Sequence, residues 1–185
     1  MILVAAFAVM AQASQPVAVP SDAATRGIAT ALQACEAWLM RPATWADSID
    51  QFPENAGLSG KIVARRSIPD AVAPPDGWCT APHYWYAAAG PGGLFITVSD
   101  TRPLCHVVGG SSEDLQPATE AVLTQPDFKT NWSAGEEKSD GDMRMTRYVS
   151  RIDPHLWMTV SRAAKPGERK DRPQVAITAQ MDVER

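Results

Sequence analysis

Apolar residues spaced three to four positions apart predict two helices before the first strand. Asp22 can cap the first helix at its N-terminus. The buried stripe of this helix consists of Ile28, Leu32, Cys35 and Leu39. Thr44 can cap a second, short helix, which Pro53 ends. The apolar face of this second helix consists of Trp45, Ile49 and Phe52.

Runs of β-branched and aromatic residues between turn signals then predict an antiparallel sheet. Residues 61–68 mix β-branched side chains with charges, as edge strands do to discourage pairing with other chains. Residues 83–86 predict the next strand, and the glycines of residues 90–93 predict the turn after it. Two further strands are predicted at 94–100 and 104–110.

A third helix and a second set of strands follow. Ser112 or Asp114 can cap this helix, and Pro117 is tolerated because it falls in the first turn. Apolar and polar residues then alternate in three segments, 143–151, 156–162 and 174–182. In the first of these segments the apolar positions are Met143, Met145 and Val149.

The whole pattern predicts an α+β fold whose elements run roughly α-α-β-β-β-α-β-β-β. Strands with a period of two and one apolar face indicate an antiparallel meander that helices half cover. We therefore expect an antiparallel sheet with the helices packed on one face.

The N-terminus predicts export. Residues 1–13 are apolar, carry no charged side chain and end in Ala11-Gln12-Ala13, a small-x-small pattern that signal peptidase accepts. A run of about eleven apolar residues is too short to span the hydrocarbon core of a bilayer. We interpret 1–13 as a signal peptide, 14–21 as a flexible leader and 22–185 as a single domain, and expect a periplasmic or secreted protein without a membrane span.

Composition narrows the class of partner. The chain is 45% hydrophobic and 21% charged, which is ordinary for a globular protein, and its formal net charge is −4. A negative balance opposes non-specific binding to nucleic acid or to anionic lipid. We therefore expect no nucleic-acid partner.

Three cysteines allow three different single disulfides. An oxidising compartment favours the formation of a disulfide. Cys35 lies on the buried stripe of a helix and Cys105 lies in a strand, so a bridge from 35 to 105 is the preferred pairing. Bridges from 79 to 105 and from 35 to 79 stay open, because the distance between Cα atoms decides. The preferred pairing leaves Cys79 as a free thiol.

A thiol-dependent or metal-dependent protein is the alternative to a binding protein. Cys79, His83 and His106 lie on neighbouring predicted segments, and zinc or copper accepts such ligands. A disulfide that includes Cys79 would exclude this site, and no recognised catalytic signature surrounds these residues. We predict no catalytic residue, no bound metal and no cofactor.

Two charged segments flank the last strands. Residues 133–142 are acidic and read as a mobile loop, and residues 162–173 are basic. An up-and-down meander places both at one edge, so they should be neighbours. Two interpretations are possible. Either the two segments are solvated and form weak ion pairs with each other, or they form a rim with acidic and basic residues that binds a partner. The basic residues assigned to the rim are Arg162, Lys165, Arg169, Lys170 and Arg172.

The aromatic run at 83–86 is the other candidate surface. In a strand, Tyr84 and Tyr86 share one side, while His83 and Trp85 share the other, so one side is core. The second side can present rings to a glycan or a peptide. The residues assigned to binding are Trp78, His83, Trp85 and Tyr86. We therefore predict a non-catalytic binding or interaction module of the cell envelope, with an envelope protein or a glycan as its partner.

Overall fold

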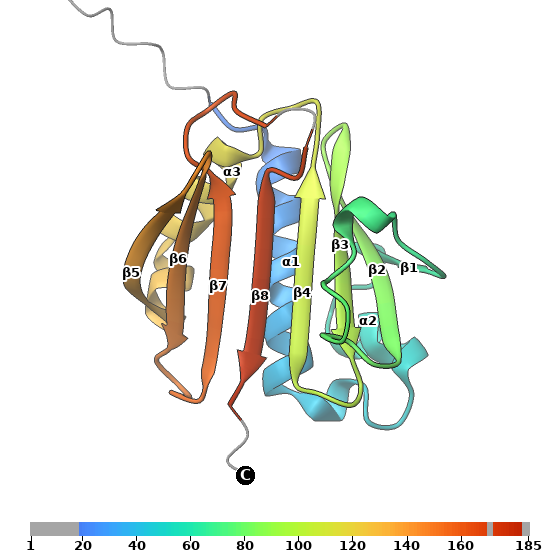
Figure 1. Ribbon diagram of the computed structural model, residues 1–185. Helices are drawn as coiled ribbons and strands as arrows, with labels where there is room; N and C mark the ends of the chain where they lie inside the picture. Colours follow the sequence, from blue (N-terminus) through green and yellow to red (C-terminus); the bar gives the residue numbers. More distant parts are fainter. Residues whose placement is uncertain (1–18, 170–171, 183–185) are drawn as a thin grey trace, which may run out of the picture.

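Eight antiparallel strands form one sheet with the order β1-β2-β3-β4-β8-β7-β6-β5. The computed structural model describes residues 19–169 and 172–182, and Figure 1 shows the arrangement of its strands. The first four strands are β1 (Ile62–Arg65), β2 (Pro82–Ala89), β3 (Gly92–Ser99) and β4 (Leu104–Gly110). The last four are β5 (Trp132–Asp140), β6 (Met143–Ser150), β7 (Leu156–Ala163) and β8 (Val175–Met181).

The sheet consists of two four-stranded meanders that meet at its centre. Within each meander consecutive strands pair, and the last strands of the two meanders, β4 and β8, pair with each other. The first meander follows α1 (Asp22–Met40) and the short α2 (Phe52–Asn55), and the second follows α3 (Gln116–Thr124) and α4 (Pro126–Asn131). The α+β class is therefore confirmed, and one arrangement of helices before a meander occurs twice.

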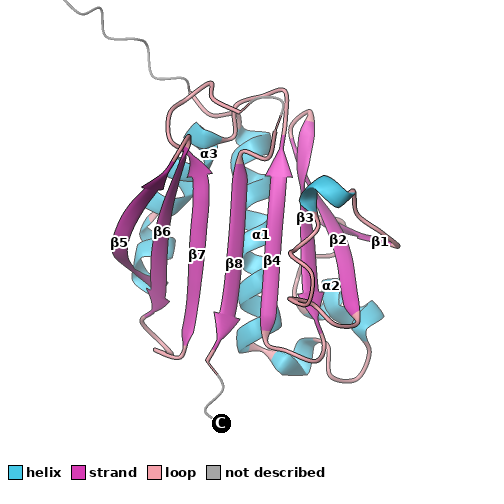
Figure 2. Ribbon diagram, viewed as in Figure 1, coloured by secondary structure: helices cyan, strands magenta, loops and turns pink. Residues whose placement is uncertain are grey.

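The two sides of the sheet differ in what covers them. In the view of Figure 2, α1 and α3 lie behind the sheet. α1 contacts β2, β3, β4 and β8, and α3 contacts β7. We call this the helix side and the opposite one the open side. Residues 66–81, which include a 3₁₀ turn at Asp70–Val72, pass over the open side in front of the first meander (Figure 1).

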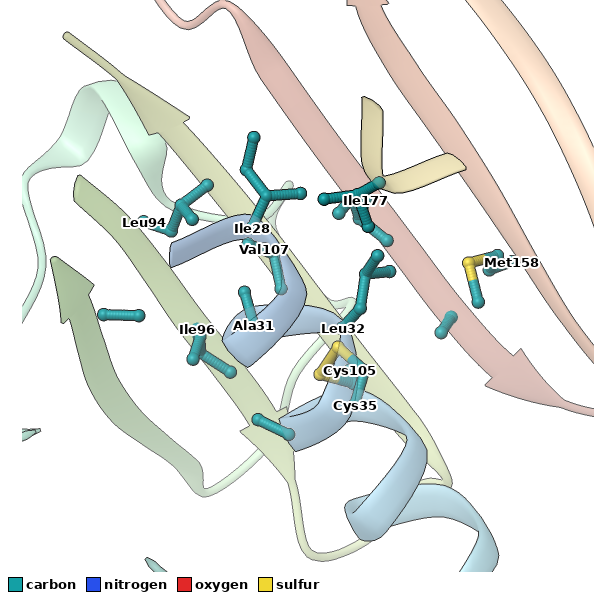
Figure 3. Close-up of a cluster of buried hydrophobic side chains, with 14 of the residues drawn as sticks. Ile28, Ala31, Leu32, Cys35, Leu94, Ile96, Cys105, Val107, Met158 and Ile177 are labelled. Atoms are coloured by element: carbon teal, nitrogen blue, oxygen red, sulfur yellow. A yellow bond between two sulfur atoms is a disulfide. The ribbon is translucent and has the colours of Figure 1, made fainter. Parts of the chain in front are cut away.

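The core lies between α1 and the helix side of the sheet. The side chains of Ile28 and Leu32 are buried and face those of Ile96 and Val107 on β3 and β4 (Figure 3). A disulfide joins Cys35 to Cys105, with the two Cα atoms 5.3 Å apart, and confirms the preferred pairing. It fixes the helix to a central strand of the sheet.

Gly27 allows α1 to approach the hairpin of β2 and β3 closely. A Cβ atom at this position would lie 2.7 Å from the Cβ of Ala89 and would overlap the carbonyl oxygen of Ala88. The absence of a side chain is therefore what lets the helix backbone contact the hairpin.

The helix boundaries correct four predictions. Ser21, not Asp22, caps α1, because its Oγ accepts the N–H of Ala24 at 3.2 Å. The second helix is not continuous: 3₁₀ turns at Pro42–Thr44 and Ile49–Gln51 precede α2. Pro53 falls in the first turn of α2, where a proline is tolerated, so it does not end a helix. α3 begins at Gln116, with Leu115 at the N-cap position, although Oδ1 of the predicted Asp114 accepts the N–H of Gln116 at 3.0 Å.

The acidic segment 133–142 is not a loop. It forms most of β5 and the tight turn to β6, with a bulge between Ala134 and Glu137. Most side chains of this strand are exposed on both sides of the sheet, so the sequence does not alternate between apolar and polar residues. Backbone pairing with β6 holds it in the sheet, and this explains why the pattern alone indicated a loop.

The buried and exposed faces of β6 are the reverse of those predicted. Met143, Met145 and Val149 lie half-buried on the open side, opposite residues of β7 such as Ser161. The buried positions are Thr146, Tyr148 and Ser150, on the helix side. An ion-pair cluster occupies that side here, and it buries polar partners instead of an apolar face.

Two further predictions concern the N-terminal signal peptide and the absence of a membrane span. The signal peptide 1–13 and most of the leader 14–21 fall outside the described residues. Among the helices of the described part, none has the length and the apolar character that a bilayer span requires.

Candidate functional site

The alternation of side chains along β2 decides which aromatic residues reach the surface. Tyr84 and Tyr86 lie on the open side, while His83 and Trp85 lie on the helix side, as the period of two predicted. Trp85 is only 3% exposed, and its ring lies 5.1 Å from that of Phe52. The assignment of Trp85 to a binding surface is therefore wrong, because the residue belongs to the core.

His83 lies at the end of the core and is half-buried. Its Nε2 lies 3.6 Å from Oδ2 of Asp100, and its ring lies 6.4 Å from that of Trp85. The Nε2 atom is buried and has no hydrogen-bond partner in the described part of the chain. The residue pairs across β3 with Val98, whose neighbour on β4 is the disulfide-bonded Cys105.

His106 lies on the other side of the sheet from His83. It is buried beneath the ring of Trp78, with the ring centroids 5.9 Å apart, and its Nδ1 lies 2.8 Å from the hydroxyl of Thr178. Burial lowers the pKa of His106 to about 4. Trp78 itself is 41% exposed, so it covers the imidazole and still reaches solvent. His106 is neutral at ordinary pH.

Cys79 is a free thiol in the segment that passes over the open side. Burial raises the pKa of this thiol, and the nearby Arg102 guanidinium opposes the rise only in part. The thiol form therefore dominates near neutral pH, and a thiol is a poor nucleophile and metal ligand.

The predicted alternative site of Cys79, His83 and His106 is not assembled. The two histidines point to opposite sides of the sheet, so one ion cannot bind both. Within residues 19–169 and 172–182, no group of three histidine, cysteine or carboxylate side chains is placed to hold a metal.

A hollow on the open side lies beside Tyr86, the last residue of the aromatic run. We call it the Tyr86 groove, and its volume is about 470 Å3. Its walls come from the segment 66–81 and from the connection between β7 and β8, and its floor is β3 and the end of β4. The residues that line it are Ala71, Val72, Tyr86, Gly92, Gly93, Phe95, Gly110, Ser111, Arg172 and Pro173.

Tyr86 is held in place from several directions. Its hydroxyl donates a hydrogen bond to the carbonyl of Gly92 at 3.0 Å, and its ring meets that of Phe95 edge-on at 5.3 Å. The guanidinium of Arg65 lies 5.1 Å from the ring centroid. A Cβ at Gly93 would overlap the ring, so the tyrosine lies directly on the glycine backbone. The ring is therefore a fixed wall of the groove.

Arg172 supplies the charge at the rim of the groove. It is 59% exposed, and its Nη2 donates to Oδ2 of Asp142 at 3.0 Å. Arg169 donates to the other carboxylate oxygen of Asp142 at 2.5 Å. Although desolvation acts against it, hydrogen bonding from Arg169 lowers the pKa of Asp142. The other N–H groups of Arg172 form no hydrogen bond within the described residues, and this half-exposed guanidinium can donate them to a ligand.

The two charged segments are neighbours, but their charges largely neutralise each other. Arg162 is 4% exposed and lies on the helix side, with Nε 2.7 Å from Oε1 of Glu120 and Nη2 2.8 Å from Oε2 of Glu137. Its place on a surface rim is therefore wrong. Arg169 is half-buried against Asp142, and Lys170 falls outside the described residues.

Of the residues that line the groove, Tyr86 and Arg172 were singled out from the sequence and the others were missed. Phe95 was detectable, because the alternation in 94–100 places it opposite the buried Leu94 and Ile96. Val72 gave no signal, since only the folding of segment 66–81 over the sheet brings it to Tyr86. Arg172 belonged to the predicted basic rim, and the structure places it at the rim of the groove.

Comparison with protein-family models, with curated proteins and with solved structures finds no match for this chain.

Proposed function

We propose that this protein is an exported, non-catalytic binding module of the cell envelope, and that its ligand occupies the Tyr86 groove. The observation that carries the proposal is the groove itself. Its volume of about 470 Å3 falls within the range of about 300–1,000 Å3 that small-molecule sites occupy. It lies on the open side, between two connecting segments, where a ligand can enter without displacing a helix.

The lining residues favour a glycan or a peptide. Phe95 and Tyr86 offer apolar ring surface, and the glycine floor lets a flat ligand group approach the backbone. Arg172 offers hydrogen-bond donors to a carboxylate or a hydroxyl at the rim. The ligand we propose has one apolar face and one polar or anionic end.

Binding without chemistry agrees with the groove's composition. Among the described residues, its lining includes no histidine, cysteine or carboxylate side chain, and the hydroxyl of Ser111 accepts the N–H of Glu113 at 3.0 Å. The hydroxyl of Tyr86, which could also serve as a general acid or base, is held by its hydrogen bond to the carbonyl of Gly92. The disulfide between Cys35 and Cys105 supports the proposed export, because disulfides persist in oxidising compartments.

Ligand-observed NMR with soluble envelope glycan fragments and short peptides tests the proposal. We expect at least one member to bind the wild-type protein, and Phe95→Ala or Arg172→Ala to weaken that binding. Arg151→Ala is the matched control, because Arg151 is exposed and lies outside the groove lining. Circular dichroism verifies that each variant is folded. A binder that the groove variants leave unaffected, or the absence of any binder, contradicts the proposal.

A further inference from the structure

The edge of the sheet at β1 has a free row of backbone groups. Within residues 19–169 and 172–182, β1 pairs only with β2, through residues 62–65 opposite 84–87. Alternate residues of β1 therefore point their N–H and C=O groups away from the sheet. Val63 on this strand is 55% exposed, although it is a large apolar residue. An additional strand would find both backbone partners and an apolar contact here.

The side chains along this edge form a patch of uncompensated positive charge. We call it the basic edge, and it consists of Arg26, Lys61, Arg65 and Arg66, all of them exposed. None of the four forms an ion pair with a carboxylate in the described part of the chain. Asp50 borders the same hollow as Arg65 and Arg66 without pairing with either.

The opposite end of the sheet is different. Arg144, Arg162, Arg169 and Arg172 all form ion pairs there, with Glu120, Glu137 or Asp142. Strand β5 also contains a bulge and many charges, which are devices that protect an edge from pairing. The basic edge therefore brings four cations without carboxylate partners in the described residues to one edge of the sheet, in a chain whose net charge is −4.

A hollow continues the basic edge beyond the end of β1. β2 runs two residues further than its pairing with β1, so Ala88 and Ala89 have no strand on that side. The hollow beside them is lined by small residues of α1 such as Gly27, and Arg26 and Lys61 border it. Its volume is about 510 Å3, enough to accept side chains that follow the paired residues of an added strand.

We propose that an extended acidic segment of a partner protein binds here as a ninth strand, antiparallel or parallel to β1. Main-chain hydrogen bonds supply affinity in this mode of recognition, and side-chain contacts supply specificity. Carboxylates on the segment lie beside the basic edge, while an apolar residue covers Val63. A second copy of this chain is a poor occupant, because two basic edges would repel each other.

This proposal does not depend on the Tyr86 groove or on its ligand. Arg65 contacts the ring of Tyr86, so the test uses Lys61 and Arg66, which lie outside the groove lining. The variant is Lys61→Glu/Arg66→Glu. Lys129→Glu is the matched control, because Lys129 is exposed on α4 and forms no ion pair in the described chain.

Fluorescence anisotropy measures binding of a peptide in which glutamate alternates with valine and threonine. We expect the wild type and Lys129→Glu to bind this peptide alike, and Lys61→Glu/Arg66→Glu to bind at least about tenfold more weakly. The same peptide with alternate backbone amides methylated should not bind, because its strand edge cannot pair. Hydrogen exchange at the amides of residues 63–65 should slow when the unmethylated peptide binds.

Three outcomes would overturn the proposal. One is no binding of the acidic peptide to the wild type. Another is equal binding of the methylated peptide, which would mean charge attraction without strand addition. The third is displacement of the bound peptide by anionic vesicles or single-stranded DNA at matched charge concentration, which would assign the basic edge to a lipid or a nucleic acid.

Discussion

The Nε of Arg162 lies 2.7 Å from Oε1 of Glu120, so a nearly buried guanidinium on β7 is ion-paired to α3. The same guanidinium donates to Glu137 on β5 and to the hydroxyl of Thr146 on β6 at 2.9 Å. One side chain therefore ties a helix to three strands of the second meander. In the first meander, the disulfide joins a helix to the sheet, and in the second meander this ion-pair cluster does so.

Arg162→Leu should destabilise the protein by about 3 kcal/mol, because it leaves three acceptors without their buried donor. Arg162→Lys should be intermediate, since an ammonium cannot match the fork of contacts that a guanidinium makes. Arg144→Leu, at 30% exposed side chain, should lose only about 1 kcal/mol. Urea unfolding of the three variants measures this order. A neutral Arg162→Leu would show that the cluster does not stabilise the fold.

Removal of the disulfide should lower the free energy of unfolding by about 4 kcal/mol, because the bridge spans 70 residues and restricts the unfolded chain. Cys35→Ala/Cys105→Ala and chemical reduction should have similar effects on denaturant midpoints. Cys79→Ser is the control and should unfold like the wild type. Thiol counting of the native oxidised protein should find Cys79 alone. A stable, well-folded double alanine variant would contradict the role assigned to the bridge.

His106 should titrate near pH 4 in an NMR experiment, far below the ordinary histidine value of 6.5. Trp78 covers the imidazole, so Trp78→Ala should raise the pKa of His106 toward the ordinary value. Phe95→Ala serves as the control, since it removes a different ring from the same side of the sheet. A pKa of His106 that does not change when Trp78 is removed would show that other groups bury the imidazole.

The same histidine should make stability depend on pH. The unfolded chain takes up a proton near pH 6.5 and the folded chain only near pH 4. The stabilisation is therefore complete above pH 6.5 and is lost progressively as the pH falls toward 4, by about 3 kcal/mol. As the pH falls from 6.5 to 4, the free energy of unfolding of His106→Gln should decrease less than that of the wild type. Chemical denaturation at a series of pH values measures this difference. Parallel pH profiles for the two proteins would contradict the prediction.

Gly27→Ala should destabilise the protein by about 2 kcal/mol, because the added methyl overlaps the backbone of the β2–β3 hairpin. Thr30→Ala, on the same helix at a half-buried position, should change stability by much less. Thermal unfolding separates the two variants. A stabilised Gly27→Ala protein, as the higher helix propensity of alanine alone would give, would mean that the helix tolerates a small shift.

The parts of the fold that were predictable rest on simple periodicity. The apolar stripe of α1 and the alternation of apolar and polar residues in β2, β7 and β8 identify buried positions. Because Cys35 lies on the stripe of α1 and Cys105 lies in a strand, the sequence also indicates their pairing. In each case one face meets an apolar core, so hydrophobicity alone separates the faces.

The parts that were not predictable depend on polar burial or on long-range folding. Arg162 looks like a surface residue in sequence, because its three acceptors come from segments far away along the chain. The same cluster inverts the faces of β6. The groove residue Val72 is brought to Tyr86 by a segment with little regular structure. No local pattern encodes these contacts.

The central claim is that the open side binds a ligand in the Tyr86 groove, and a chemical-shift map of the isotopically labelled protein tests it most directly. Titration with a binder from the glycan and peptide screen should move the amide signals of Gly93, Phe95 and Arg172 first and most strongly. Signals on the helix side, such as those of α3, should stay in place. Shifts that centre on Cys79 and His106 instead, with the groove signals unchanged, would contradict the account.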